Sequence, residues 1–214
     1  MDRVGRATFA NFSVNKCPGS RAWYLLKRAW PLSLAVPGDV LEDQRRIMLE
    51  MRDIKIMPYS LFYNHFHEIS EHETRIVTVI DQSVFNLPPA DYSFLEMFCD
   101  EPGCDCRRVF FSVLSSLQND IQAVITWGWE KREFYAKWMG DDDPIIIRDL
   151  IGPALNLVSP QTKFASALLD LFRNVLLKDA AYVDRIKRHY AMFRQKIDNQ
   201  ANSACLRKKK RRKA

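Results

Sequence analysis

Residues 94–129 read FLEMFCDEPGCDCRRVFFSVLSSLQNDIQAVITWGW, and this stretch decides the fold. It contains three apolar runs rich in aromatic and β-branched residues, at 94–98, 109–114 and 121–129. Runs of this length, separated by Pro-Gly and Asn-Asp pairs, are typical of strands joined as hairpins. We therefore expect three consecutive antiparallel strands, with a cysteine-rich loop at the first turn.

The segment before this stretch predicts a further strand. In residues 76–80 apolar side chains occur on both faces of the expected strand, with Ile76 and Ile80 on one face and Val77 and Val79 on the other. Strands that are apolar on both faces are typical of the centre of a sheet. The sequence thus predicts a four-stranded antiparallel meander over residues 73–129, with a central strand at its start.

Helical patterns follow the sheet. Gly140 is placed to end one helix, Asp143 and Pro144 to begin the next, Pro160 to begin a third and Asp179 to cap the last. The expected apolar faces of the last two helices are Phe164, Leu168, Leu171, Phe172 and Val175, then Tyr182, Ile186, Tyr190, Phe193 and Ile197. Strands followed by helices predict an α+β fold with the C-terminal helices packed on one face of the sheet.

The length of 214 residues suits one domain with extensions. The expected parts are a flexible arm at 1–20, a single α+β domain at 21–198 (helical lead 21–58, sheet 73–129, helical part 130–198) and a disordered basic tail at 199–214. No apolar run approaches the ~20 residues that span a bilayer, and no secretory signal is visible. We therefore expect a cytoplasmic protein.

Three cysteines form the strongest chemical signal. Cys99, Cys104 and Cys106 follow the spacing C-x4-C-x-C around a Pro-Gly turn. In a reducing compartment clustered cysteines are more often metal ligands than disulfides, and zinc favours sulfur ligands. Arg107 and Arg108 are expected to lower the pKa of these thiols and to offset the charge of the thiolates. Redox chemistry, or a hairpin tip with incidental thiols, are the alternatives.

A structural zinc ion takes a fourth ligand, and the sequence offers five candidates: His65, His67, His72, Cys17 and Cys205. A fourth position left open to water would instead indicate catalysis. The sequence does not choose among these ligands.

The histidine segment suggests a second arrangement. On a strand, His65 and His67 would point to the same face and could bind a metal, with Glu68, Glu71 or Glu73 as a general base. The alternative is an exposed polar connection.

Aromatic residues of the last strand and the next helix suggest packing. Trp127, Trp129 and Trp138 are expected to fill a core between sheet and helix, and Gly128 to allow a close backbone approach. His189 is expected to be a packing histidine with satisfied ring nitrogens.

Positive charge is concentrated at the C-terminus. Residues 185–214 contain twelve basic residues and one acidic residue, a net charge of +11, whereas the whole chain carries +6. The final run is Arg207, Lys208, Lys209, Lys210, Arg211, Arg212 and Lys213. Such a run can bind nucleic acid by counterion release, or an acidic protein or anionic membrane, and in a eukaryote it can direct nuclear import. A solubilising end without a partner is the plain alternative.

The cysteine loop also carries a resemblance. The segment 98–109, together with Leu155-Asn156, Ser159-Pro160-Gln161, the run RIKRHY at 185–190 and Phe193, resembles a group of uncharacterised bacterial proteins. Some members of that group end in a zinc-binding module of the SEC-C type, whose paired cysteines this chain lacks. The resemblance spans about residues 70–197 and implies a bacterial, cytoplasmic origin and a metal-binding loop.

The sequence therefore predicts a zinc-stabilised, non-enzymatic binding protein whose basic tail meets nucleic acid or an acidic partner. One alternative is a metal-dependent enzyme that uses His65 and His67 with the cysteine loop. Another is a plain interaction domain without metal.

Overall fold

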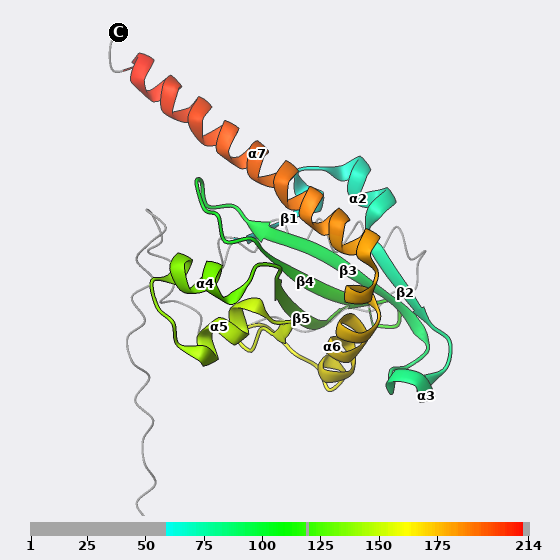
Figure 1. Ribbon diagram of the computed structural model, residues 1–214. Coiled ribbons are helices and arrows are strands. Elements are labelled where there is room, and N and C mark those ends of the chain that lie inside the picture. Colours follow the sequence, from blue (N-terminus) through cyan, green and yellow to red (C-terminus); the bar gives the residue numbers. More distant parts are fainter. Residues whose placement is uncertain (1–58, 119, 212–214) are drawn as a thin grey trace, which may run out of the picture.

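The computed structural model describes residues 59–118 and 120–211, with side chains up to residue 203. This part of the chain folds as an antiparallel sheet with helices on its face and at its edge, so the predicted α+β class is confirmed (Figure 1). The expected arm at 1–20, the helical lead at 21–58 and Cys17 lie outside the described residues. Among the described helices, none is long and apolar enough to cross a membrane.

In the described part of the chain the sheet has six strands rather than the four predicted. They are β1 (Tyr59–Leu61), β2 (Arg75–Val79), β3 (Ala90–Cys99), β4 (Arg108–Ser115), β5 (Ile121–Gly128) and β6 (Ala154–Leu155). The predicted antiparallel succession from β2 to β5 is present, and β1 and β6 extend it. The two added strands are three and two residues long, too short to show a period-two pattern.

The first predicted strand was expected to be central, but among the described strands it lies at an edge of the sheet. Within residues 59–118 and 120–211, β2 pairs only with residues 90–94 of β3, and β1 continues along the same edge of β3 at residues 97–99. Ile76 is 39% exposed, whereas Val79 packs into the core. The apolar residues on both faces of β2 therefore do not indicate burial on both faces.

The main core lies between one face of the sheet and the last two long helices. The helices are η2 (Phe62–Asn64), α2 (His67–Glu73), α3 (Gln82–Phe85), α4 (Arg132–Met139), α5 (Pro144–Ile151), α6 (Ala165–Asn174), η3 (Leu176–Lys178) and α7 (Ala180–Arg211). Phe94, Phe98 and Phe111 of the sheet pack with Phe172 of α6 and Phe193 of α7. Figure 1 shows α7 crossing the sheet above β3.

Most of the predicted helix ends are confirmed. Gly140 ends α4 with a φ of +72°, and Asp143 caps α5 because its Oδ1 accepts from the amides of Ile145 and Ile146. Asp179 accepts from the amide of Tyr182 at the start of α7. These ends are local features, so the sequence alone is sufficient to place them.

The start of α6 differs from the prediction. We expected the helix to begin at Pro160, but it begins at Ala165. Two of the intervening residues, Gln161 and Thr162, form hydrogen bonds with the backbone of β5 instead. Gln161 exchanges two hydrogen bonds with the backbone of Val124, and the Thr162 hydroxyl donates to the carbonyl of Gln122. This strand-edge pairing competes with helix formation.

The last helix is longer than expected. All five predicted apolar positions of α7 are buried, but the helix continues beyond residue 198 to Arg211. We expected a disordered tail from residue 199. No glycine or proline occurs between Ala180 and Arg211, so the sequence contains no residue that would stop the helix there.

Candidate metal centre

The three cysteines of the loop converge. Cys99 is the last residue of β3, and Cys104 and Cys106 lie in the connection to β4. Their Sγ atoms all lie within 4.8 Å of one another, and all three residues are buried. Among the described residues, this is the one group of three or more candidate metal ligands. The predicted clustering is therefore present in the fold.

Two left-handed residues shape the loop around the cysteines. Gly103 has a φ of +74°, and the Cys104 amide closes a turn on the carbonyl of Glu101 at 3.2 Å. Arg107 has a φ of +48°, which costs a non-glycine residue about 1–2 kcal/mol. The chain therefore turns sharply between Cys106, which enters the cluster, and the first residue of β4.

Neighbouring tyrosines hold Arg107 in this conformation. The Tyr135 hydroxyl of α4 donates to its carbonyl at 2.8 Å, and its amide donates to the Tyr190 hydroxyl of α7 at 3.2 Å. The Arg107 guanidinium pairs with Asp105 and Glu130, both at 3.0 Å. The fold thus fixes the residue after Cys106 from both sides.

The pKa values of Cys99 and Cys106 are raised rather than lowered as expected, although a hydrogen bond from the Arg108 backbone amide lowers the pKa of Cys106. For Cys99, contact with the Cys104 thiol lowers the pKa, but contact with Cys106 and burial outweigh it and raise the pKa to about 12. For Cys106, contact with Cys104 is the largest effect, and together with burial it raises the pKa to about 12. Arg108 instead donates to the carbonyl of Leu150 at 3.0 Å.

Without a metal the thiols of Cys99 and Cys106 are therefore protonated at neutral pH. A bound ion must displace their protons, because the thiolate is the metal ligand. The site is a buried set of soft sulfur donors, which fits zinc or another thiophilic ion.

Aromatic side chains form the walls of the cluster. Tyr59 of β1 pairs in register with Cys99, and Tyr59 and Trp138 of α4 pack against the three cysteines. Trp138 therefore lies at the cysteine cluster rather than in the main core. Trp127 and Trp129 pack on the main core as expected, with Trp129 edge-on to a tyrosine of α7 at 5.0 Å.

Helix α7 binds the cysteine loop directly, which the sequence did not indicate. The Arg194 guanidinium donates to the carbonyl of Cys99 at 2.8 Å and to Asp198 at 2.6 Å. Asp198 in turn accepts from the amide of Gly103 at 2.9 Å. Arg194 and Asp198 are four residues apart, a spacing from which an ion pair on one helix face can be predicted. Their contact with the cysteine loop cannot be predicted from the sequence.

The three histidines of the N-terminal segment do not join the cysteines in the described structure. The segment forms a 3-10 turn followed by α2 rather than a strand, so His65 and His67 do not form a same-face strand pair. His65 contacts Ser60 Oγ at 3.3 Å, and burial is the main cause that lowers its pKa, followed by Lys196. His67 and His72 are exposed.

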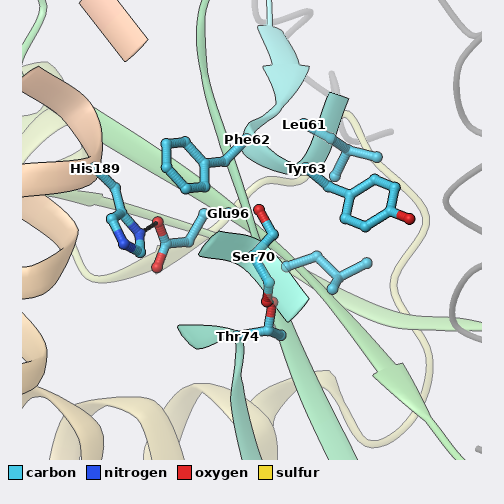
Figure 2. A pocket seen from close by; sticks show the side chains of 8 residues that line it. Leu61, Phe62, Tyr63, Ser70, Thr74, Glu96 and His189 are labelled. Carbon is cyan, nitrogen blue, oxygen red and sulfur yellow. Dashed lines mark hydrogen bonds and ion pairs between the residues drawn. The ribbon is translucent and has the colours of Figure 1, made fainter. Parts of the chain in front are cut away.

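A buried ionic cluster lies between α7, β3 and α2. His189 Nδ1 lies 2.8 Å from Glu96 Oε2, and its Nε2 lies 3.1 Å from Glu73 Oε2 (Figure 2 shows the first pair). The His189 side chain is 2% exposed and stacks on Phe62 with 4.3 Å between ring centroids. Arg188 also pairs with Glu73. The prediction that the ring nitrogens of His189 are satisfied is confirmed, but its carboxylate partners were not foreseen.

The cavity next to this cluster is too small for a substrate. It measures about 10 Å³ and is lined by Glu96, His189, Ser70 and Thr74 among others (Figure 2). A space of this size holds at most one water molecule. The cluster therefore ties three elements together and provides no chamber for a reaction.

Comparisons with protein-family models, with curated proteins and with solved structures find no match to this chain. The geometry of the cysteine loop and of α7 is therefore the ground on which a function can be inferred.

Proposed function

We propose that this is a non-enzymatic binding protein in which one zinc ion, held by Cys99, Cys104 and Cys106, fixes the β3–β4 hairpin tip. Its basic C-terminal residues bind the phosphate backbone of nucleic acid. The observation that carries the metal site is the mutual approach of three buried Sγ atoms to within 4.8 Å.

The sulfur geometry supports a single ion. Zinc–sulfur bonds of about 2.3 Å in a tetrahedron place the sulfur atoms about 3.8 Å apart. Side-chain rotations are enough to bring thiols that already lie within 4.8 Å to that spacing. The loop backbone, fixed at Gly103 and Arg107, need not rearrange.

The surroundings favour a structural role for the ion over a catalytic one. The three cysteines are at most 7% exposed, and aromatic residues pack against them. Structural zinc sites are closed by four protein ligands. Because His67 and His72 are exposed and His65 does not lie with the three sulfur atoms, we propose that the fourth ligand is Cys17 or Cys205.

Metal analysis of the purified full chain under reducing conditions tests this proposal. We expect one zinc per chain in the wild type and in Pro102→Ala, an exposed position of the same loop, and less than half of that in Cys104→Ser. Cys17→Ser and Cys205→Ser then identify the fourth ligand by loss of affinity, and His65→Ala, which should keep its zinc, is the control. A wild-type protein that purifies and reconstitutes without stoichiometric metal contradicts the proposal.

The nucleic-acid part of the proposal rests on charge. Seven basic residues from Arg207 to Lys213 would release counterions on binding a duplex, so the logarithm of the affinity should fall with the logarithm of salt concentration with a slope of up to about −6. Deletion of residues 206–214 should remove this salt-dependent binding to DNA or RNA. Binding that is unchanged in the deletion variant contradicts this part of the proposal.

A further inference from the structure

Three successive turns of α7 contact the cysteine loop on one side of the helix. Tyr190, Arg194 and Asp198 are spaced four residues apart. The Tyr190 hydroxyl accepts from the Arg107 amide, Arg194 donates to the Cys99 carbonyl, and Asp198 accepts from the Gly103 amide. The helix therefore binds the loop backbone at the first cysteine, between the first and second cysteines, and directly after the third.

These contacts depend on the shape of the loop. All three use backbone groups of the loop, whose positions are set by the path of the chain between residues 99 and 107. An ion bound to three side chains of this segment restricts that path, as a cross-link does. Loss of the ion removes this cross-link, so the backbone partners of Arg194 and Asp198 are held less firmly.

The part of α7 beyond Asp198 is a weak helix by itself. It continues to Arg211, a further 13 residues or about 20 Å, and Figure 1 shows its end projecting beyond the sheet. Isolated helices of fewer than about 12–15 residues are marginal in water. Like charges four residues apart, such as Arg207 and Arg211, destabilise this segment further. Its helical state must therefore rely on an anchor in the body of the protein.

We propose that the metal at the cysteine loop controls this helical end, and that the metal-loaded protein binds duplex nucleic acid more tightly than the metal-free protein. This inference rests on the function proposed above. With the ion bound, Arg194 and Asp198 hold α7, and residues 199–211 extend the helix, which includes residues 207–211 of the basic run. Without the ion, the end of the helix frays, and binding must first restore its order.

A linear polyanion is the partner that this arrangement fits best. Duplex DNA carries one negative charge per about 1.7 Å of its axis, a higher linear charge density than that of an extended acidic peptide, in which charges are about 3.3–3.6 Å apart. An acidic protein is the competing partner. Polyglutamate of matched charge therefore serves as the comparison polymer in the binding assay.

Hydrogen exchange of the full chain, combined with binding to a short DNA duplex at low salt, tests the inference. We expect zinc chelation to raise the exchange rate of amides in 199–211 about tenfold and to weaken duplex binding by a similar factor. Asp198→Ala should produce both effects while it retains one zinc per chain. Asp184→Ala removes the same charge from an exposed position about four turns earlier on α7 and should produce neither effect.

The outcomes separate this inference from the proposed function. If zinc binds stoichiometrically but neither chelation nor Asp198→Ala changes exchange or duplex affinity, the control by metal is refuted and the zinc site stands. If no zinc binds, both fail together. If polyglutamate binds as tightly as the duplex, the assignment to nucleic acid is refuted. Asp198→Ala remains decisive if chelation unfolds the whole protein.

Discussion

Substitution of Gly128 by alanine tests how closely the last residue of β5 approaches its neighbours. A Cβ atom at this position would lie 2.2 Å from the Tyr135 hydroxyl oxygen and 2.6 Å from the carbonyl oxygen of Leu150. Both neighbours are engaged elsewhere: Tyr135 donates to the Arg107 carbonyl, and Leu150 accepts from Arg108. The added methyl group must therefore displace groups that position the residues directly after Cys106.

The expected cost follows from these contacts. Overpacking of a close-packed site costs about 1–3 kcal/mol, and loss of the Tyr135 hydrogen bond adds about 1 kcal/mol. We expect Gly128→Ala to lower the free energy of unfolding by about 2–4 kcal/mol, which corresponds to a fall in Tm of about 5–15 °C for a chain of this size. Zinc affinity should fall as well, since Arg107 loses one of its two tyrosine contacts.

Denaturant unfolding of Gly128→Ala, Tyr135→Phe and the double variant measures this effect. Tyr135→Phe alone removes only the hydrogen bond and should cost about 1 kcal/mol. The double variant should recover part of the loss, because the 2.2 Å conflict with the hydroxyl disappears while the conflicts with the ring Cζ at 2.7 Å and with the Leu150 carbonyl remain. A Gly128→Ala protein as stable as the wild type would refute the close approach of β5 to α4 and α5.

Three further predictions concern the rest of the molecule. His189→Ala leaves the buried carboxylate of Glu96 without its partner and should lower the free energy of unfolding by about 3–5 kcal/mol in denaturant titrations, whereas a loss below 1 kcal/mol would show that the pair is unimportant. In the metal-free protein, the pKa of Cys99 and Cys106 is raised to about 12, so their stabilising contribution is complete below the unfolded pKa of about 8.5 and is lost as the pH rises toward 12. Urea midpoints should therefore fall between pH 8 and 9.5, and Cys106→Ser should reduce that fall; midpoints that stay constant over this range would contradict the raised pKa values. Asp179 has a lowered pKa because it accepts from the Tyr182 amide and pairs with Arg75, so its stabilising contribution is present above the unfolded pKa and is lost on acidification. Asp179→Ala should flatten the decline in thermal stability between pH 5 and 3, and an unchanged decline would argue against the capping role.

Local patterns in the sequence were sufficient for much of the fold. The strands β3, β4 and β5 and the buried face of α7 can be predicted from the spacing of apolar residues along the chain. This spacing can be read without knowledge of distant parts of the structure. The N-caps at Asp143 and Asp179 follow from the preference of a short carboxylate side chain for free amides. β1, β6 and the pairing of Gln161 with Val124 could not be predicted, because each is too short to form a pattern and exists only through its partner strand.

For the site, the sequence by itself determined that three thiols occur within eight residues of a hairpin turn, a spacing that lets them meet without help from distant segments. Only the tertiary structure decided what surrounds them. It directs the arginines to other partners, raises the pKa of Cys99 and Cys106 by mutual contact and burial, and places Arg194 and Asp198 of α7 on the loop backbone. The physical reason is that desolvation and contacts across about 95 residues of chain depend on how the elements pack, which the spacing of residues along the sequence does not specify.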